Sequence, residues 1–301
     1  QEDDGDPQAS LETIEALLDR FHGNDVAGIH LLELHLHRLQ VLMSLGRYSQ
    51  VVEACTRAQV LLDRVLPSWS EFFRTTLRLE GAYCAVYLDP RPEAADRLLE
   101  SLESVDLPGT MRFIARSVRG ELELTRGNVR TAALIQRVSL RYAGNWRSIL
   151  GSGSQWELYI LSMCLVTDVE LRPDDAVELD AGAIRARAVF LLHDILSDPA
   201  PRQRDIPTIM AFAAAVGLSV VAAEDAGSDR RSVGAELITT ALAVGTNQTC
   251  RLLSHSYLRT RTEQLDARAL VQAGERIRSL DRAQLVAHAA GLARRLAGET
   301  G

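Results

Sequence analysis

Lysine is absent from this chain of 301 residues, and all 33 of its basic residues are arginines. Enzymes that form a Schiff base with a substrate or with pyridoxal phosphate need a lysine amine, which a permanently protonated guanidinium cannot replace. The Walker A loop and the protein kinase fold each require a phosphate-binding lysine as well. The composition therefore excludes pyridoxal-phosphate enzymes, Schiff-base aldolases, Walker A nucleotidases and protein kinases.

Long apolar runs and paired cysteines are also lacking. No stretch reaches the roughly 18 uninterrupted apolar residues that a membrane span needs, and the acidic beginning QEDDGDP lacks the apolar segment of a signal peptide. The absence of any C-x-x-C pair excludes a zinc ribbon and a dithiol redox motif. We expect a cytoplasmic protein without membrane contact and with buried thiols at Cys55, Cys84, Cys164 and Cys250.

Apolar residues instead recur at helical spacing, and no convincing period-2 strand pattern occurs. Leu32, Leu36, Leu39 and Met43, for example, share one helix face. The pattern predicts an all-α fold with helices at 10–21, 26–45, 47–66, 69–88, 93–104, 155–168, 182–197, 206–226, 230–244, 247–260, 264–276 and 280–297. Between Arg112 and Tyr142 it predicts two further helices that break at 125–128.

The residues that interrupt these helix patterns predict two lobes. Residues 1–9 are expected to form a disordered acidic tail, and Ser10 can cap the first helix. An N-terminal lobe is predicted over 10–168 and a C-terminal lobe over 182–301. The segment 169–181, VELRPDDAVELDA, is the predicted linker, either a loop or a loop with one short turn.

Two glycine turns indicate that the helices form repeated hairpins. Leu45-Gly46-Arg47-Tyr48 separates two helix patterns, and Gly127-Asn128 separates two more, with Gly120 before that turn and Ala132 after it. These residues resemble the tetratricopeptide repeat, which places a glycine in its first helix, Leu-Gly-x-Tyr at its turn and alanine in its second helix. The spacing is longer than 34 residues, and the tryptophan and closing proline of the repeat are mostly missing or shifted. The resemblance extends over residues 26–300, with two well-matched units.

Arrays of this kind, rich in arginine, are similar to the C-terminal repeat regions of large bacterial ATP-binding transcriptional regulators. The resemblance implies a right-handed superhelical α-solenoid without a cofactor, which serves as the interaction or effector-sensing part of a regulatory protein. A concave groove would bind a protein or peptide partner or a small effector, and a homo-oligomer is possible. Its candidate residues are the aromatics and one arginine at Tyr48, Trp69, Phe73, Tyr83, Tyr87, Arg116, Trp156 and Tyr159.

A helical metal-dependent hydrolase or cyclase is the first alternative. His30, Glu33 and His37 are spaced i, i+3 and i+7, so the three side chains share a helix face and are a weak candidate metal site. His193-Asp194 matches the dipeptide of helical metal phosphohydrolases. The D-D-x-x-E spacing of magnesium-binding terpene cyclases occurs at Asp174, Asp175 and Glu178. Each pattern lacks the companion ligands that its chemistry needs.

Nucleic-acid binding by the C-terminal region is the second alternative. The net charge of −7 disfavours general affinity for nucleic acids. Charge is unevenly distributed, however, because residues 251–301 contain nine arginines against five acids. The arginines are Arg251, Arg259, Arg261, Arg268, Arg276, Arg278, Arg282, Arg294 and Arg295, and they predict a basic face.

Overall fold

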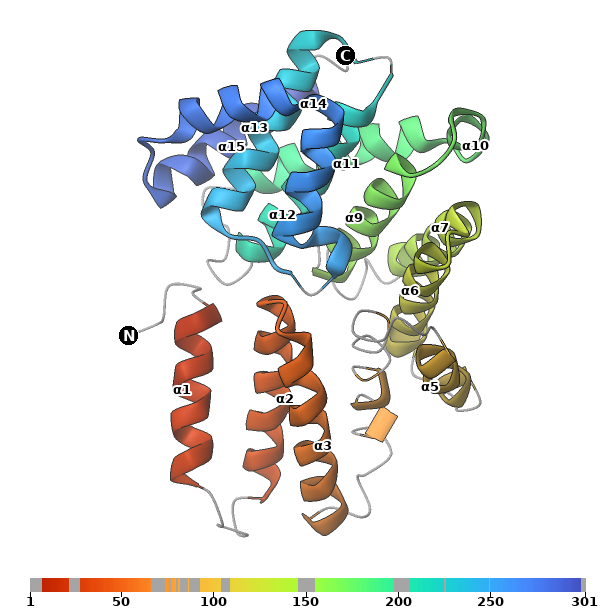
Figure 1. The fold of residues 1–301 in the computed structure, drawn as a ribbon, viewed down its shortest axis with the longest axis vertical. Helices are drawn as coiled ribbons and strands as arrows, with labels where there is room; N and C mark the ends of the chain where they lie inside the picture. Colours follow the sequence, from red (N-terminus) through yellow and green to blue (C-terminus); the bar gives the residue numbers. More distant parts are fainter. Residues whose placement is uncertain are drawn as a thin grey trace. The chain divides into compact units, whose positions relative to one another are not determined.

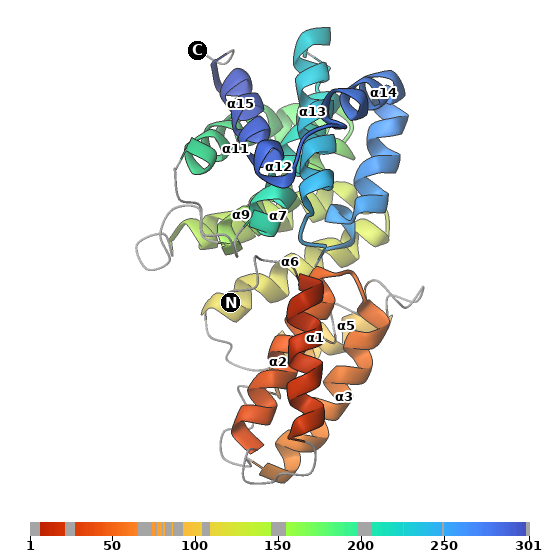
Figure 2. The same cartoon turned by 90° about the vertical axis from the view of Figure 1, so that its left-hand side faces the viewer.

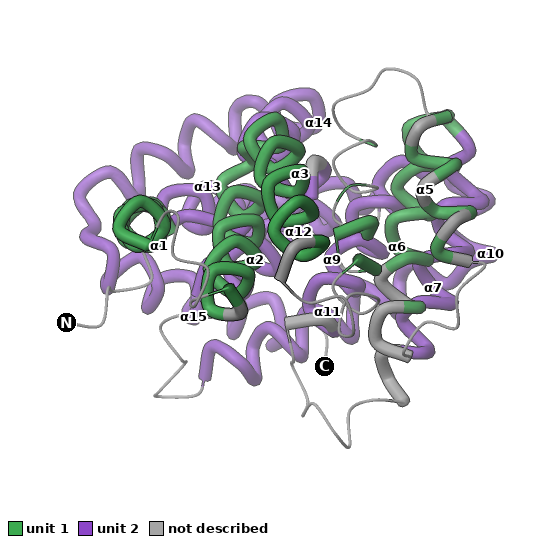
Figure 3. Tube along the Cα trace, turned by 90° about the horizontal axis from the view of Figure 1, so that it is seen from below, with its two compact units in different colours: residues 1–127 green, residues 128–301 purple. Residues whose placement is uncertain are grey.

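The computed structural model describes residues 7–21, 28–65, 74–75, 77–79, 81, 86, 93–103, 109–145, 155–197, 206–224, 226–248 and 250–298. Every regular element among these residues is a helix, so the all-α prediction is confirmed (Figure 1). The chain divides into two compact units, unit 1 at residues 1–127 and unit 2 at residues 128–301 (Figure 3). None of the described helices has the length and apolar character needed to cross a membrane.

Unit 1 begins with three antiparallel helices, α1 (Pro7–Arg20), α2 (Gly28–Ser44) and α3 (Tyr48–Val65). α2 packs on both of its neighbours, and Figure 2 shows the three axes nearly aligned. Periodic leucines and small residues fill the space between them, because one face of each helix carries them at i, i+3, i+4 and i+7. The fully buried side chains include Leu11, Leu32, Leu39, Leu42, Val51, Ala54, Ala58 and Leu62.

The turn between α2 and α3 has the geometry that its glycine predicts. Gly46 has a φ of 68°, and the amides of Gly46 and Arg47 donate to the carbonyl oxygens of Met43 and Leu42 at 2.9 Å each. This pair of bonds is a Schellman motif, in which a glycine adopts the left-handed conformation after the last helical turn. Gly127, at the second predicted turn, has a φ of 80° and donates to Leu124 at 3.0 Å.

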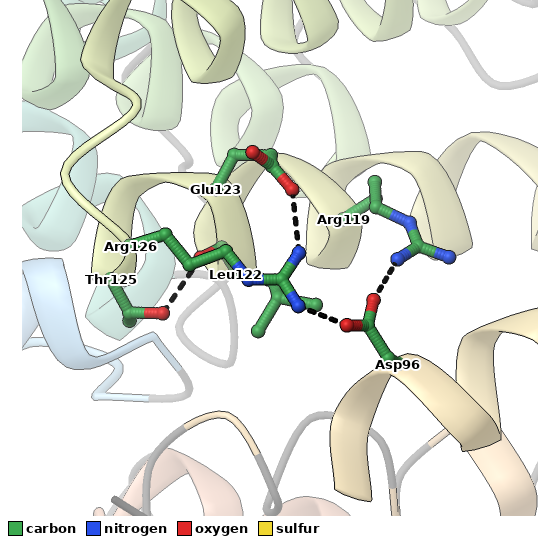
Figure 4. A network of polar contacts seen from close by, with 6 residues as sticks. All are labelled: Asp96, Arg119, Leu122, Glu123, Thr125 and Arg126. Carbon is green, nitrogen blue, oxygen red and sulfur yellow. Dashed lines mark hydrogen bonds and ion pairs between the residues drawn. The ribbon is translucent and has the colours of Figure 1, made fainter. Parts of the chain in front are cut away.

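The rest of the described part of unit 1 includes α5 (Glu93–Glu103) and α6 (Gly109–Thr125). A polar network joins these helices, as Figure 4 shows. Asp96 of α5 accepts hydrogen bonds from Arg119 and Arg126, and Arg126 also donates to Glu123 at 2.8 Å. The hydrogen bond to Asp96 raises the pKa of Arg126. All of these side chains are partly exposed, so the network orients α5 on α6 more than it stabilises the fold.

Unit 2 surrounds one apolar helix. α12 (Ile206–Ala222) has no charged residue, and every residue from Ile209 to Val221 is buried. A helix that is apolar on all sides must be covered on all sides, and among the described elements α12 packs mainly on four α-helices. These are α9 (Gln155–Val169), α11 (Ala181–Ser197), α13 (Ser228–Val244) and α14 (His255–Ile277). α7 (Val129–Asn145) packs on α9, and α15 (Arg282–Gly298) packs on α11 and α13.

α12 and α13 cross at a pair of glycines. A Cβ atom added to Gly217 would lie 2.6 Å from the carbonyl oxygen of Gly234, and one added to Gly234 would lie 2.8 Å from that of Gly217. Since both obstructing atoms belong to the backbone, neither can rotate away. The two glycines therefore set how closely the two most extensively packed helices of unit 2 approach each other.

The predicted helix boundaries differ from the structure at both ends of the chain. α1 begins at Pro7, so residues 7–9 of the predicted tail are helical and Ser10 is not the cap. Proline suits the first helical position, because its missing N–H has no acceptor there. The predicted helices at 247–260 and 264–276 are a 3₁₀ turn, η3 (Arg251–Leu253), followed by α14, in which only Asp266 is non-helical (φ −159°). Its carboxylate accepts from the amide of Ala269 at 2.9 Å and thereby caps the second half of α14.

The predicted linker at 169–181 lies inside unit 2. It contains a short helix, α10 (Pro173–Glu178), which packs on α11. Arginines of α7 hold this segment, because Arg130 forms ion pairs with Asp175 and Glu178 and Arg137 donates to the carbonyl oxygen of Leu179 at 2.8 Å. The division between units 1 and 2 falls at Gly127–Asn128 instead.

Candidate functional site

The predicted aromatic groove falls largely outside the described residues. Trp69, Phe73, Tyr83 and Tyr87 are not described, and neither is the side chain of Trp156. The remaining candidates are partly buried and lie on three helices: Tyr48 on α3, Arg116 on α6 and Tyr159 on α9. The groove of aromatics therefore stays a prediction.

The candidate metal ligands lie on the surface. His30 Nδ1 is 3.3 Å from Glu33 Oε2, with both side chains and that of His37 exposed. His193 Nδ1 is 3.2 Å from the hydroxyl oxygen of Ser197, and Asp194 is exposed. Among the residues that the structure describes, no three His, Cys, Asp or Glu side chains are grouped so that they could hold a metal ion.

The D-D-x-x-E segment is a set of ion pairs. Asp175 accepts hydrogen bonds from Arg172, at 2.9 Å, and from Arg130, and these two bonds lower its pKa. Glu178 accepts from Arg130 at 2.6 Å, whereas Asp174 is exposed. Arg130 comes from α7, 45 residues before Asp175. Its guanidinium therefore lies between the two carboxylates that a magnesium ion would bridge.

The C-terminal arginines are divided between ion pairs and exposed positions. Arg261 Nε lies 2.9 Å from Glu170 Oε1, and Arg276 Nε lies 2.7 Å from Glu236 Oε2. Glu236 is buried and also lies 2.7 Å from His288 Nε2, so it joins α13, α14 and α15. The arginines with exposed side chains on α14 and α15 include Arg259, Arg268, Arg294 and Arg295. Nucleic-acid binding by this region stays a prediction.

A groove of about 770 Å³ lies between the first three helices of unit 1. α2 packs on both α1 and α3 and is drawn between them in Figure 3. We call this groove the α1–α3 groove, and we call the lining residues of α2 its floor and those of α1 and α3 its walls. Its lining residues are Glu15, Leu18 and Asp19 of α1, Leu31, His35 and Arg38 of α2, and Thr56, Arg57, Val60 and Leu61 of α3.

The α1–α3 groove combines an apolar surface with charged residues. Leu31 and Leu61 are nearly covered, but Val60 is 65% exposed on the α3 wall. Arg38 donates to Glu15 Oε1 from Nη2 at 2.9 Å and from Nε at 3.2 Å, so these two charges compensate each other. Asp19 is exposed and has no hydrogen bond or ion pair within the described part of the chain.

On the floor of the groove, His35 has a ring nitrogen that makes no hydrogen bond to any described residue. Its Nδ1 is buried without a partner among the described residues. Burial, followed by the nearby charges of Arg38 and Arg57, lowers the pKa of His35. A half-buried imidazole near two arginines, with its pKa lowered from the ordinary value, is therefore neutral at pH 7.

Replacing His35 by glutamine is expected to reduce the loss of stability in acid. Because the pKa of His35 is lowered in the folded protein, the unfolded chain gains a proton there first as the pH falls. The contribution of His35 to the free energy of unfolding is therefore fully present above about pH 6.5 and is lost as the pH falls, until His35 also becomes protonated in the folded protein. Chemical denaturation at about pH 7.5 and about pH 5.5 should give a smaller difference for the variant.

His255 provides the internal reference for that comparison. Burial also lowers its pKa, and both proteins retain it, so its contribution cancels. Equal losses of stability in the two proteins would show that His35 is not responsible.

A second pocket, of about 460 Å³, lies in unit 2 between α9, α10, α11 and α12. Its lining includes the carboxylates of Asp168, Asp180 and Glu224, the guanidinium of Arg185 and apolar side chains of α9 and α12. Asp168 already accepts from Arg137 Nη1 at 2.8 Å and Nη2 at 3.0 Å. Burial raises the pKa of Asp168, and the hydrogen bonds from Arg137 oppose that shift. The pocket has the volume of a small-molecule site, but its most buried carboxylate is fully engaged by arginine.

None of the residues that line the α1–α3 groove belongs to the set predicted from the sequence. That set favoured aromatics, whereas this groove is lined by leucine, valine and ionised side chains. Two features of the sequence could have indicated the groove. Glu15 and Asp19 are spaced i, i+4 on α1, and Val60 is an apolar residue among the polar residues of α3.

No protein-family model, curated protein or solved structure matches this chain, so the interpretation rests on the geometry alone.

Proposed function

We propose that this chain is a non-enzymatic interaction module that binds a segment of a partner protein in the α1–α3 groove. The observation that carries the proposal is the groove itself, about 770 Å³ in volume with an exposed valine on its wall. Helix-in-groove recognition uses an open apolar channel between helices, into which the partner inserts residues spaced i, i+3 or i+4, and i+7. Polar residues at the rim then fix the orientation of the partner.

The proposed architecture is a tetratricopeptide-like stack in a regulatory protein. Two features support it, the antiparallel packing of α1, α2 and α3 and the left-handed glycines at Gly46 and Gly127. The resemblance to repeat regions of bacterial transcriptional regulators adds the proposed setting, a cytoplasmic protein that transmits binding of a partner to other parts of a regulator. A protein or peptide is a suitable partner for such a stack. Each hairpin buries one face against its neighbours and leaves the opposite face open for binding.

Selection of helical peptides from a display library on the intact chain tests this proposal. Enriched peptides are expected to bind the unchanged protein and to bind Val60→Arg at least about tenfold more weakly, because the new side chain fills the groove. Val271→Arg is the matched control, since Val271 on α14 is 64% exposed and lies in unit 2. Circular dichroism verifies that both variants retain their helix content. Failure to enrich any peptide, or equal binding to Val60→Arg, would refute the groove as the binding site.

A further inference from the structure

We infer that the segment bound in the α1–α3 groove is an amphipathic helix that carries a lysine or arginine on the side facing α1. This inference rests on the proposed function and specifies the chemistry of the partner. It follows from an uneven distribution of charge between the two walls of the groove. The apolar face of the helix would contact Leu18, Leu31 and Val60.

The α1 wall is acidic. Glu12, Glu15 and Asp19 are spaced i, i+3 and i+7, so they share one face of α1, and the last two line the groove. Glu15 is compensated by Arg38, which leaves Asp19 as the carboxylate without an ion-pair partner among the described lining residues. Asp19 also lies in the last turn of α1, where the free carbonyl groups of the helix add partial negative charge.

The lining residues that the structure describes on the α3 wall carry no comparable net charge. Arg57 Nη2 lies 2.6 Å from Glu53 Oε1, and the neighbouring lining residues Thr56 and Val60 are uncharged. On the floor, His35 is neutral at pH 7 and Arg38 is paired. A cation on the partner is therefore attracted toward α1 only, and this asymmetry orients the helix across the groove.

An acidic partner does not fit this arrangement. A carboxylate or phosphate near Asp19 would face a like charge, with no unpaired arginine among the described residues that line the groove to compensate it. A long lysine or arginine side chain, by contrast, can cover apolar surface with its methylene groups and place its charge at the rim. Because the pair formed with Asp19 is exposed to solvent, we expect it to change affinity by about two- to fivefold.

The experiment uses a display library of helical peptides selected on the intact chain. Leucines are fixed at i, i+3, i+4 and i+7, and the positions flanking them are lysine, glutamate or glutamine in equal proportion. We expect lysine to be enriched on one flank. In the enriched peptide, replacing that lysine by glutamine should weaken binding by about two- to fivefold, and this difference should disappear with Asp19→Asn.

Asp194→Asn is the matched control, because Asp194 is an exposed carboxylate on α11 without an ion pair among the described residues. The lysine preference should persist in this variant, and it should shrink when the salt concentration rises from about 0.05 M to about 0.5 M. Equal enrichment of lysine and glutamate in peptides that still require Val60 would overturn this inference and leave the proposed function standing. A lysine preference that survives Asp19→Asn would overturn it too. No enrichment at all would refute both.

Discussion

Replacing Gly217 by alanine should lower the free energy of unfolding by about 3 kcal/mol, because the added methyl group has no space at the crossing of α12 and α13. Its Cβ would lie 2.6 Å from the carbonyl oxygen of Gly234, 2.8 Å from Cγ1 of Ile238 and 3.3 Å from the amide nitrogen of Ile238. The side chain of Ile238 can adjust, but the backbone atoms move only if the two helices separate. Separation would open gaps along α12, the most buried helix of unit 2.

Gly291→Ala is the matched control for this substitution. Gly291 also lies within a helix, α15, but it is exposed, and a Cβ added there meets no atom within 4 Å. Alanine favours the helical conformation over glycine, so this variant should gain about 0.5–1 kcal/mol. Urea denaturation followed by circular dichroism measures both effects. Changes of the same sign in the two variants would contradict the close crossing of α12 and α13.

Loss of either partner in the Arg137–Asp168 ion pair should be the second large effect. The side chains of Arg137 and Asp168 are only 10% and 8% exposed, and both oxygens of the carboxylate accept from the guanidinium. Arg137→Met would leave a buried carboxylate whose pKa burial already raises, and Asp168→Leu would leave a buried guanidinium. Each single replacement should cost about 3–5 kcal/mol, most of it from the unpaired charge that remains.

The double replacement separates this explanation from a simple loss of contacts. With both charges removed, no uncompensated charge remains, so Arg137→Met with Asp168→Leu should cost clearly less than the two single replacements added together. Arg57→Met is the control, because Arg57 and Glu53 form an exposed pair at 62% and 61% exposure and should change stability by less than about 1 kcal/mol. Additive losses from Arg137 and Asp168 would show that the pair is not coupled.

The features that the sequence predicted correctly are local ones. Gly46 and Gly127 were assigned to turns from the helix patterns around them, and both have the positive φ that a left-handed turn requires. Most helices were found from their apolar spacing, which reports contacts within one or two turns. The start at Pro7 and the cap at Asp266 were missed, because several nearby residues can begin a helix equally well.

The features that the sequence could not predict depend on contacts between distant residues. Nothing near Asp175 and Glu178 shows that Arg130, on another helix, occupies the space between their carboxylates. Similarly, Arg137 and Asp168 are separated by 31 residues and look like surface charges until α7 and α9 are packed together. The α1–α3 groove was missed for the same reason, because three helices contribute to it and each contributes only three or four lining residues.

The burial of α12 has a consequence for the synthesis of the chain. Ribosomes make α12 before α13 and α14, which provide much of its cover, so an uncharged apolar helix must wait for its later partners. Molecular chaperones that bind exposed apolar segments would find their target between Ile206 and Ala222 during that interval. A nascent chain released before residue 228 would expose this segment permanently and aggregate.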